Sequence, residues 1–337
     1  MLYELKENSL NALSYLTKRI RHSSNTQPLS IEFVCGFHGK SGGPIAIASI
    51  ANGLAKVFNV NFVLTATSFY ARLLSSEIKF TRNIDFSKDV YIVDLSADEN
   101  VVRQIKAHNK LIILTIHGLR NALHKLNNEH IDNMLSLADK VHFVGQVQQD
   151  SYQLTADSFF IIPNSAQAVN KSKTTSNIGV VGNLDEPRKN AATSVEIGLR
   201  SDCEKIHLWS TSKQFSGDPR VIHHSWENDK EKIFDSFDVL VFLSQQETFG
   251  LVIAEALSAG IPCVLSNIDA FIPFQPCPGV VLIEESEQAN AHSLINQLML
   301  EKENLRPQIQ TFFNQHFSQS IVNQQWHEKV IELSEAK

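Results

Sequence analysis

Residues 243–265 read LSQQETFGLVIAEALSAGIPCVL, and the order of elements in this stretch decides the fold. An apolar strand ends at Ser244, a polar loop follows, and a helix begins near Phe249. The helix stops at Gly260, as helices commonly do, and a second apolar strand begins at Pro262. A strand, a helix and a further strand in this order form the repeating unit of a parallel α/β sheet.

Two glutamates stand out in this stretch. Glu247 lies in the loop after the strand, close to a helix N-terminus whose unpaired amides attract anions. Glu255 lies eight residues further on, within an otherwise apolar helix. A buried carboxylate needs a partner, because an unpaired buried charge is very costly. Periodicity leaves two roles open for Glu255: a structural pair with Arg or Lys, or the binding of a ligand such as a pair of sugar hydroxyls.

The same alternation of strand and helix extends in both directions along the chain. Nearly continuous apolar strands that alternate with helices predict parallel sheets covered on both faces. We therefore predict the α/β class, with two doubly wound Rossmann-like domains facing a central cleft, since such sheets bind ligands at the carboxyl ends of their strands. The strands that define the two series are Ile31–Cys35, Phe62–Thr65, Val90–Leu95, Leu111–Ile116, Lys140–Val144 and Phe159–Ile162, then Ile178–Val181, Lys205–Trp209, Val221–His224, Val239–Ser244, Pro262–Ser266 and Val280–Ile283.

A short polar stretch separates the two series. Lys171–Ser176 (KSKTTS) has no apolar residue and is the candidate linker. The predicted parts are an N-terminal helical extension over residues 1–30, a first Rossmann-like domain over 31–170, a second over 171–316 and a C-terminal helix over 317–337.

The composition fits an ordinary globular chain. With 337 residues, 43% of them hydrophobic, the length favours two domains and excludes wholesale disorder. No apolar run is long enough to cross a bilayer, and residues 1–30 are too charged for a secretory signal, so we expect a cytoplasmic protein. Four scattered cysteines support neither a disulfide scaffold nor a zinc site; they are Cys35, Cys203, Cys263 and Cys277.

The charge pattern argues against a nucleic-acid partner, because the net charge is −6 and neither half is strongly basic. A short basic cluster, Lys18–His22, lies near the end of a predicted helix over Leu2–Ile20. Two interpretations stay open for this cluster. It is either a solvated helix end whose cations suit the helix dipole, or a contact with anionic lipid on the inner face of the membrane.

Residues 247–262, ETFGLVIAEALSAGIP, resemble the E-x7-E signature of retaining glycosyltransferases of family 4, which have the GT-B fold of two Rossmann domains. The likeness includes both glutamates, the Phe-Gly-Leu run at 249–251 and the Gly-x-Pro ending at 260–262. The resemblance spans roughly residues 31–330, which makes the first domain the acceptor domain and the second the nucleotide-sugar donor domain.

A second segment, residues 180–190, resembles the opening of the family's donor domain, where the diphosphate binds. Lys189 matches the family's lysine there. Asn183 stands where the family usually has Arg, and Arg188 is a candidate to compensate. This departure puts one of two expected diphosphate contacts in doubt.

The resemblance implies a role for each residue. Glu255 would hold the ribose diol, and Glu247 would contact hydroxyls of the transferred sugar. Lys189, with Arg188, would stabilise the charge that grows on the departing diphosphate. Because the chain has no Asp-x-Asp motif, we predict a reaction without a metal ion. The implied donor-binding residues are Gly42, Gly43, Asn183, Arg188, Lys189, Glu247, Thr248, Phe249, Gly250, Leu251 and Glu255.

The first domain offers two further features. His117 follows a predicted strand, where the family often places a His near the reacting sugar, so His117 joins Glu247 and Lys189 as a candidate catalytic residue. Gly42-Gly43, before the first helix, fits the family's loop facing the donor phosphates. Gly39-Lys40-Ser41 is a near miss to a P-loop, because position 34 is Val where that motif needs Gly.

These features lead to one main hypothesis. It is a retaining glycosyltransferase of polysaccharide biosynthesis that transfers a hexose-type sugar from a UDP or GDP sugar to a glycan or lipid-linked acceptor, with no cofactor. Three alternatives stay open: a GT-B-fold UDP-sugar epimerase, a non-catalytic nucleotide-sugar or glycan-binding module, and a P-loop NTPase that depends on Lys40.

Overall fold

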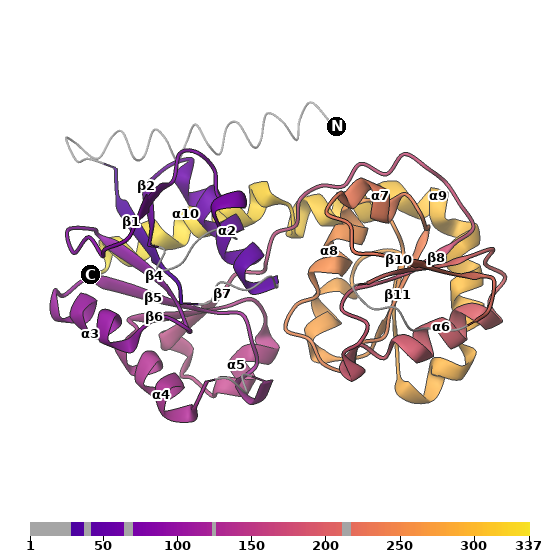
Figure 1. Cartoon of the computed structure of the whole chain (residues 1–337), viewed down its shortest axis with the longest axis horizontal. Coiled ribbons are helices and arrows are strands. Elements are labelled where there is room, and N and C mark those ends of the chain that lie inside the picture. Colours follow the sequence, from indigo (N-terminus) through magenta and orange to yellow (C-terminus); the bar gives the residue numbers. More distant parts are fainter. Residues whose placement is uncertain (1–27, 37–41, 64–69, 123–125, 211–216) are drawn as a thin grey trace. The chain divides into compact units, whose positions relative to one another are not determined.

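The computed structural model describes residues 28–36, 42–63, 70–122, 126–210 and 217–337 (Figure 1). The predicted helix Leu2–Ile20, the basic cluster Lys18–His22 and the loop Gly39–Ser41 lie outside these residues. By residue contacts the chain forms two compact units. Of the described residues, the first comprises those up to 144 together with 148–162 and 322–337, and the second comprises 145–147 and those between 163 and 321.

The first unit is built on a seven-stranded sheet with the order β3-β2-β1-β4-β5-β6-β7, in which every neighbouring pair is parallel. Its order reverses between β1 and β4, as in doubly wound sheets. The strands are β1 (Ser30–Val34), β2 (Asn59–Val63), β3 (Lys79–Thr81), β4 (Val90–Asp94), β5 (Leu111–Ile116), β6 (Lys140–Phe143) and β7 (Phe159–Ile161). The helices of this unit are α2 (Gly42–Ala55), α3 (Glu99–Ala107), α4 (Asn128–Leu137) and α5 (Gln146–Tyr152), with α10 (Gln319–Glu335) joining from the chain's end.

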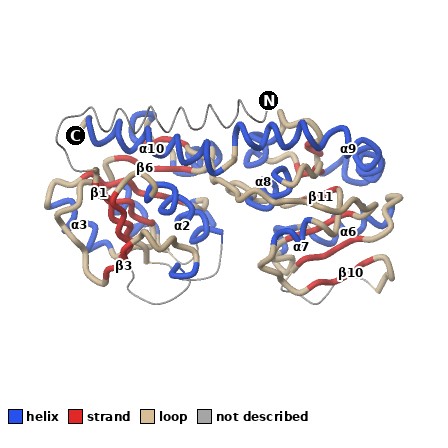
Figure 2. Tube along the Cα trace, turned by 90° about the horizontal axis from the view of Figure 1, so that it is seen from above, coloured by secondary structure: helices blue, strands red, loops and turns tan. Residues whose placement is uncertain are grey.

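Alternate residues of each strand feed two separate cores. Ile92 and Ile113 pack with α2 and α10 on one face of the sheet. Val93 and Leu114 pack with α3, α4 and α5 on the other face. Figure 2 shows α2 and α3 on opposite sides of these strands. Burial on both faces explains why the central strands are mostly apolar instead of alternating regularly with polar residues.

The second unit repeats the plan with a six-stranded parallel sheet, in the order β10-β9-β8-β11-β12-β13. Helices α6 and α9 cover one face of it. The strands are β8 (Ile178–Val181), β9 (Ile206–Trp209), β10 (Val221–His224), β11 (Val239–Phe242), β12 (Cys263–Ser266) and β13 (Val280–Ile283). The helices are α6 (Ala191–Arg200), α7 (Lys230–Phe234), α8 (Leu251–Ser258) and α9 (Ala291–His316). The predicted pair of Rossmann-like α/β domains is thus confirmed.

The last helix, α10, returns to the first unit (Figure 1). Trp326 is 1% exposed and packs on the ring of His142 at 4.5 Å between centroids. The Nε2 atom of His327 lies 2.9 Å from the carbonyl oxygen of Gly53 in α2. The sequence predicted this helix but not the unit on which it docks, and the predicted domain bounds stay a prediction.

The segment predicted as a linker is bonded along the second unit. Ser172 donates through its amide to the carboxylate of Asp235 at 2.7 Å. Lys171 is fully buried and pairs with Asp238 at 3.0 Å. These contacts hold the start of the second unit against the end of α7 and the start of β11.

Candidate functional site

The second sheet reverses its order between the neighbouring strands β8 and β11. At such a switch point two loops diverge beyond the carboxyl ends of the strands and leave room for a ligand. The loops that follow β8 and β11 are nevertheless bonded to each other here. The amide of Gln245 donates to the carbonyl oxygen of Arg188 at 2.7 Å, and the hydroxyl of Ser244 lies 3.3 Å from the same oxygen.

Three charged side chains meet at this switch point. Lys189 forms an ion pair with Glu247, and each side chain is 12% exposed. Arg188 places Nη1 3.5 Å from the same carboxylate oxygen and donates to the carbonyl of Gln246 at 2.8 Å. Ser244 donates to Glu247 at 3.0 Å. Two of the predicted catalytic residues, Lys189 and Glu247, are therefore in direct contact, with Arg188 beside them.

Asn183 belongs to the same network through a residue that sequence reasoning missed. Its amide donates to Glu186 at 2.8 Å, and the second oxygen of Glu186 pairs with Arg188 at 2.5 Å. Glu186 therefore links the two residues that were expected to share the family's arginine role. The only signal for Glu186 in the local sequence was its position, as an acidic residue just before the basic pair Arg188-Lys189.

The backbone of the first loop is shaped by two unusual residues. Gly182 follows β8 with φ of 144°, a conformation that side chains rarely adopt. Asn190 has φ of 48° and is the N-cap of α6, directly after the turn that carries Arg188 and Lys189. Asn tolerates this left-handed conformation better than most residues, which explains why Asn is suited to the position after Lys189.

The N-terminus of α8 lies in the second loop. Gly250 caps the helix with φ of 97°. The backbone conformation at this position therefore favours glycine, whether or not a ligand also approaches closely. Phe249 is buried against Phe274 and Phe317, which leaves only its backbone for a ligand. The first amides of a helix have no partner within it and attract anions. In α8 these are the amides of Leu251 and Val252, because the amide of Ile253 donates to the carbonyl oxygen of Gly250 at 2.9 Å. Thr248 precedes them and is half-buried.

Glu255 lies one turn further along α8 and pairs with Lys230, the first residue of α7, at 3.1 Å. The carboxylate is 15% exposed, and burial raises its pKa above the ordinary 4.5 while Lys230 opposes that shift. The ammonium of Lys230 also lies 5.2 Å from the ring centroid of Trp226, a cation–π contact. The partner is thus a lysine, which the sequence left open, and no local pattern points to Lys230 because it lies 25 positions away.

The first unit holds the remaining predicted residues. His117 follows β5, and its Nε2 atom lies 3.2 Å from the hydroxyl of Thr115. Burial lowers the pKa of His117 to about 4, so its ring is neutral at pH 7. Gly42 and Gly43 form the first residues of α2 at the carboxyl end of β1. The prediction that they form a loop before the helix is therefore wrong: the helix begins two residues earlier than its proline, Pro44, suggested.

Within the described ranges, no group of three or more His, Cys, Asp or Glu side chains is arranged to hold a metal ion. None of the helices that the structure describes is long and apolar enough to span a membrane.

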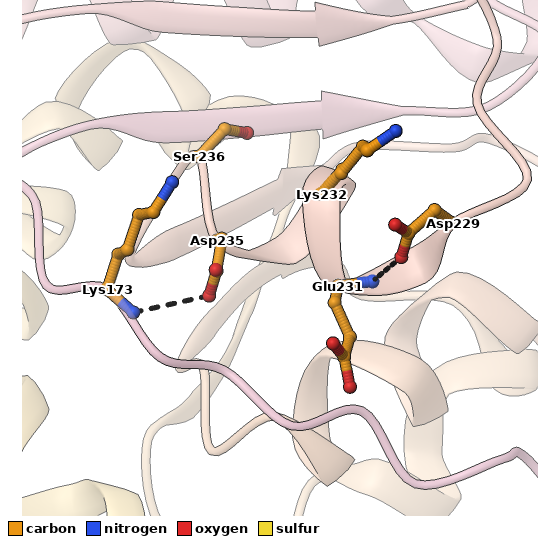
Figure 3. Close-up of a pocket in the computed structure, with 6 residues that line it drawn as sticks. All are labelled: Lys173, Asp229, Glu231, Lys232, Asp235 and Ser236. Atoms are coloured by element: carbon orange, nitrogen blue, oxygen red, sulfur yellow. Dashed lines mark hydrogen bonds between the residues drawn. The ribbon is translucent and has the colours of Figure 1, made fainter.

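A surface pocket of the second unit contains none of the predicted site residues (Figure 3). Its charges are largely satisfied by their own backbone: the amide of Lys173 donates to Asp235 and that of Glu231 donates to Asp229. Its long side chains point in different directions rather than toward one centre (Figure 3). The lining residues are Lys173, Asp229, Glu231, Lys232, Asp235 and Ser236.

Two Rossmann-like units, the second with cations at its switch point, are the components of a GT-B protein. Sequence comparison agrees for the second unit: residues 160–311 match the family model of the group 1 glycosyl transferases. The putative colanic acid biosynthesis glycosyl transferase WcaC of Escherichia coli (strain K12) is 32% identical over 78 residues. That match spans 22% of this chain and only about a fifth (19%) of the length of that relative.

Solved structures share the fold over nearly the whole chain. Anabaena Alr3699/HepE in complex with UDP has a TM-score of 0.73 at 14% identity, covering 90% of this chain and 100% of that one. The same protein in complex with UDP-glucose has a TM-score of 0.69 at 16% identity, with the same coverage. Sucrose-phosphate synthase from Thermosynechococcus elongatus has a TM-score of 0.69 at 14% identity, covering 92% and 100%. The fold is therefore GT-B, and the family match with these neighbours supports a glycosyltransferase.

Proposed function

We propose that this chain is a retaining glycosyltransferase of the family 4 type, which transfers a hexose-type sugar from a nucleoside-diphosphate sugar to a glycan or lipid-linked acceptor. The observation that carries the proposal is the contact of Arg188 and Lys189 with Glu247 at the switch point of the second sheet. These residues lie inside the stretch that matches the group 1 family model. The E-x7-E pattern places the second glutamate, Glu255, on the helix that starts in the same loop.

The cations serve the leaving group. Lys189 and Arg188 bind the diphosphate, and the amides of Leu251 and Val252 at the start of α8 add partial positive charge. Fixed donors of this kind stabilise charge that grows on a departing phosphate without reorganising at the moment of reaction. The diphosphate competes with Glu247 for Lys189, which leaves the Glu247 carboxylate to accept hydrogen bonds from hydroxyls of the sugar.

Glu255 serves the nucleoside. A carboxylate can accept two hydrogen bonds from the vicinal hydroxyls of ribose. This role needs the ionised form, which burial disfavours and the Lys230 ammonium favours. Lys230 thus favours the ionised form of Glu255 that the ribose contact needs.

The reaction is proposed to need no metal ion. The positive charge that a divalent cation would bring to the diphosphate is supplied in this proposal by Arg188 and Lys189, and Asp-x-Asp is absent from the sequence. Turnover in the presence of excess chelator, equal to turnover with added Mg²⁺ or Mn²⁺, tests this statement directly.

The donor is proposed to be a UDP sugar. HepE, with a fold similar to that of this chain, has been solved with UDP and with UDP-glucose. The acceptor is proposed to belong to a surface polysaccharide, because the relative WcaC carries a colanic acid biosynthesis description. A lipid-linked acceptor would bring the protein to the inner face of the membrane.

The test begins with binding. Thermal unfolding is measured with UDP, GDP and ADP, and a ligand at 100 times its Kd is expected to add about 2.7 kcal/mol of stability. Slow release of the nucleoside diphosphate from UDP-glucose and related UDP and GDP hexoses then identifies the donor. Glu247→Gln should abolish that release, while Glu196→Gln, a surface carboxylate 62% exposed on α6, should leave it unchanged. Proton NMR of the glycosylated product checks retention at the anomeric carbon.

The proposal fails if no uridine or guanosine nucleotide raises the unfolding temperature. A second candidate, a non-catalytic nucleotide-sugar-binding module, is favoured by one observation: Asn183 in the usual arginine position is held by the acidic Glu186. Binding of UDP with no sugar release from any UDP or GDP hexose, and with Glu247→Gln binding as the natural chain does, would favour that candidate. An epimer formed without an acceptor would instead identify an epimerase.

A further inference from the structure

The loop between β10 and α7 carries an exposed tryptophan close to Glu255. Trp226 is 41% exposed, one of the few large apolar side chains of the described residues that solvent reaches. The ammonium of Lys230 lies 3.1 Å from Oε2 of Glu255 and 5.2 Å from the ring centroid of Trp226. Because one nitrogen makes both contacts, these two distances together are the most that can separate the indole centroid from that carboxylate oxygen. All three residues belong to the second unit.

The turn that carries Trp226 is held by its own hydrogen bonds. The carboxylate of Glu227 accepts from the amide of Asn228 at 2.8 Å and from the amide of Asp229 at 3.1 Å. Asp229 in turn caps α7 by accepting from the amide of Glu231 at 3.1 Å. An aromatic side chain on a turn that is already ordered has little freedom left to lose when a ligand stacks on it.

These contacts put Trp226 beside the residues proposed to hold the rest of a nucleotide. In that proposal the amides of Leu251 and Val252, at the start of α8, help to bind the diphosphate. Glu255, which would bind the ribose, lies one turn further along α8, about 6 Å at a rise of about 1.5 Å per residue. The base of a nucleotide is attached to the ribose carbon next to the diol, so the base of a ribose bound at Glu255 comes within reach of the Trp226 ring.

We infer that the indole of Trp226 is the surface on which the nucleobase of the donor stacks, an inference that rests on the proposed function because it takes Glu255 as the ribose contact. Every nucleobase has a π face that can stack on an aromatic side chain. The Lys230 ammonium lies over one face of the indole, and the base stacks on the other. Since this stacking tolerates any base, Trp226 adds affinity for UDP and GDP alike and leaves the choice between them to other contacts.

The test compares UDP with ribose 5-diphosphate, which keeps the sugar and the diphosphate but lacks the base. Trp226→Ala is expected to raise the Kd for UDP roughly 5- to 150-fold, the range typical of base–aromatic stacking, and to leave the Kd for ribose 5-diphosphate unchanged. Trp226→Phe keeps a ring that can stack and should retain most of the UDP affinity. Leu300→Ala is the control, because Leu300 is an apolar side chain 86% exposed on α9, and it should bind both ligands as the natural chain does.

Tryptophan fluorescence of the natural chain gives a second measurement that does not depend on the folding of Trp226→Ala. The chain has three tryptophans, and the other two are largely buried: Trp209 is 8% exposed and Trp326 is 1% exposed. A base stacked on an indole quenches its emission, so UDP should quench the fluorescence and ribose 5-diphosphate should not. Trp226→Phe should abolish the quenching by UDP while UDP still binds.

Two results would overturn the inference and leave the proposed donor site standing. One is an unchanged Kd for UDP in Trp226→Ala, together with quenching that persists in Trp226→Phe. The other is an equal loss of affinity for UDP and for ribose 5-diphosphate in Trp226→Ala, because Trp226 would then act through Lys230 and Glu255 and not on the base. If the natural chain binds no nucleoside diphosphate at all, the proposed function and the inference fail together.

Discussion

Lys189 and Glu247 form an ion pair between the two loops that follow the adjacent strands β8 and β11. The pair lies at the one position of the second sheet where the strand order reverses, and the Lys189 ammonium also lies 5.1 Å from the ring centroid of Phe242. A mostly buried lysine held between a carboxylate and an aromatic face has little freedom to move. Such a cation is prepared for an anionic ligand before that ligand arrives.

Replacing Lys189 should therefore weaken nucleotide binding strongly. Lys189→Met removes one charge-assisted contact to the diphosphate, which is expected to cost about 1.5–3 kcal/mol, or roughly 10- to 150-fold in the Kd for UDP. Titration calorimetry with UDP measures the loss. Lys232→Met is the matched control, because its side chain is 64% exposed on α7, and it should bind UDP as the natural chain does. Equal affinities for the two variants would contradict the assignment of the diphosphate to Lys189.

The Glu255 carboxylate should lower the stability of the folded protein at neutral pH while it contributes to nucleotide binding. Its pKa in the folded protein is raised by burial, so as pH rises past 4.5 the unfolded chain releases this proton first and the free energy of unfolding falls. Glu255→Gln has no such loss and should be more stable than the natural chain at pH 7, with the advantage vanishing toward pH 4. Denaturant unfolding at several pH values measures the difference.

The same variant, Glu255→Gln, should also bind UDP more weakly. Without a carboxylate for the ribose diol, the Kd for UDP is expected to rise roughly tenfold or more. Lys230→Met tests the partner: it should weaken UDP binding mainly at low pH, because Glu255 then ionises less readily, and Lys230→Arg should restore it. A Glu255→Gln variant that binds UDP normally would show that this glutamate serves structure alone.

The sequence was sufficient for the elements with a strong local pattern. The predicted strand Val239–Ser244 contains β11, and the predicted helix Phe249–Ala259 contains α8, because both are apolar runs bounded by polar or glycine residues. The edge strand β3 was missed, since Lys79–Thr81 is short and mostly exposed and carries no apolar signal. α3 was also missed, although Asp98 caps it by accepting from the amide of Asn100.

Contacts between distant parts of the chain were beyond the sequence. Glu255 needed a partner by its burial, but nothing near it in the chain identified Lys230. The final helix was predicted, but its docking depends on how Trp326 and His327 meet β6 and α2 in space. Similarly, His142 reads as an ordinary strand residue until the register of β5 and β6 sets it opposite Thr115. A single sequence shows the local patterns that form each helix or strand. Which elements contact one another depends on tertiary packing, which those patterns do not reveal.

Gly250 should be sensitive to the smallest substitution. It holds φ of 97°, and an added Cβ would lie 2.8 Å from Cδ1 of Ile253 and 3.2 Å from Cε1 of Phe271. Gly250→Ala is expected to destabilise the second unit by about 1–3 kcal/mol and to displace the start of α8, with a loss of UDP affinity. Gly217→Ala is the control, because a Cβ there meets nothing within 4 Å. Thermal unfolding and UDP titration of both variants measure the contrast, and equal behaviour would contradict the strain argument.

Asp238 is expected to be the most sensitive charged residue of the second unit. It is 1% exposed, lies 3.0 Å from both Lys171 and Lys302, and accepts from the amide of Thr175. Asp238→Asn leaves Lys171, whose side chain is fully buried, without its anion and should cost about 3–5 kcal/mol. Asp238→Leu combined with Lys171→Met should recover part of that loss, because the fully buried lysine is removed together with its anion; Lys302, whose side chain is 12% exposed, still loses its partner.

The stability that Asp238 contributes should depend on pH in one direction. Burial acts to raise the pKa of Asp238, but the Thr175 amide and the two lysines outweigh it and hold the pKa below the ordinary 3.8. The stability that Asp238 contributes is therefore complete above pH 3.8 and is lost as pH falls through its lower value in the folded protein. Urea denaturation from pH 7 down to pH 3 should show the gap between the natural chain and Asp238→Asn narrowing only at the acid end. A gap that stays constant over this range would mean that the cost of the variant comes from packing, not from the lost charge.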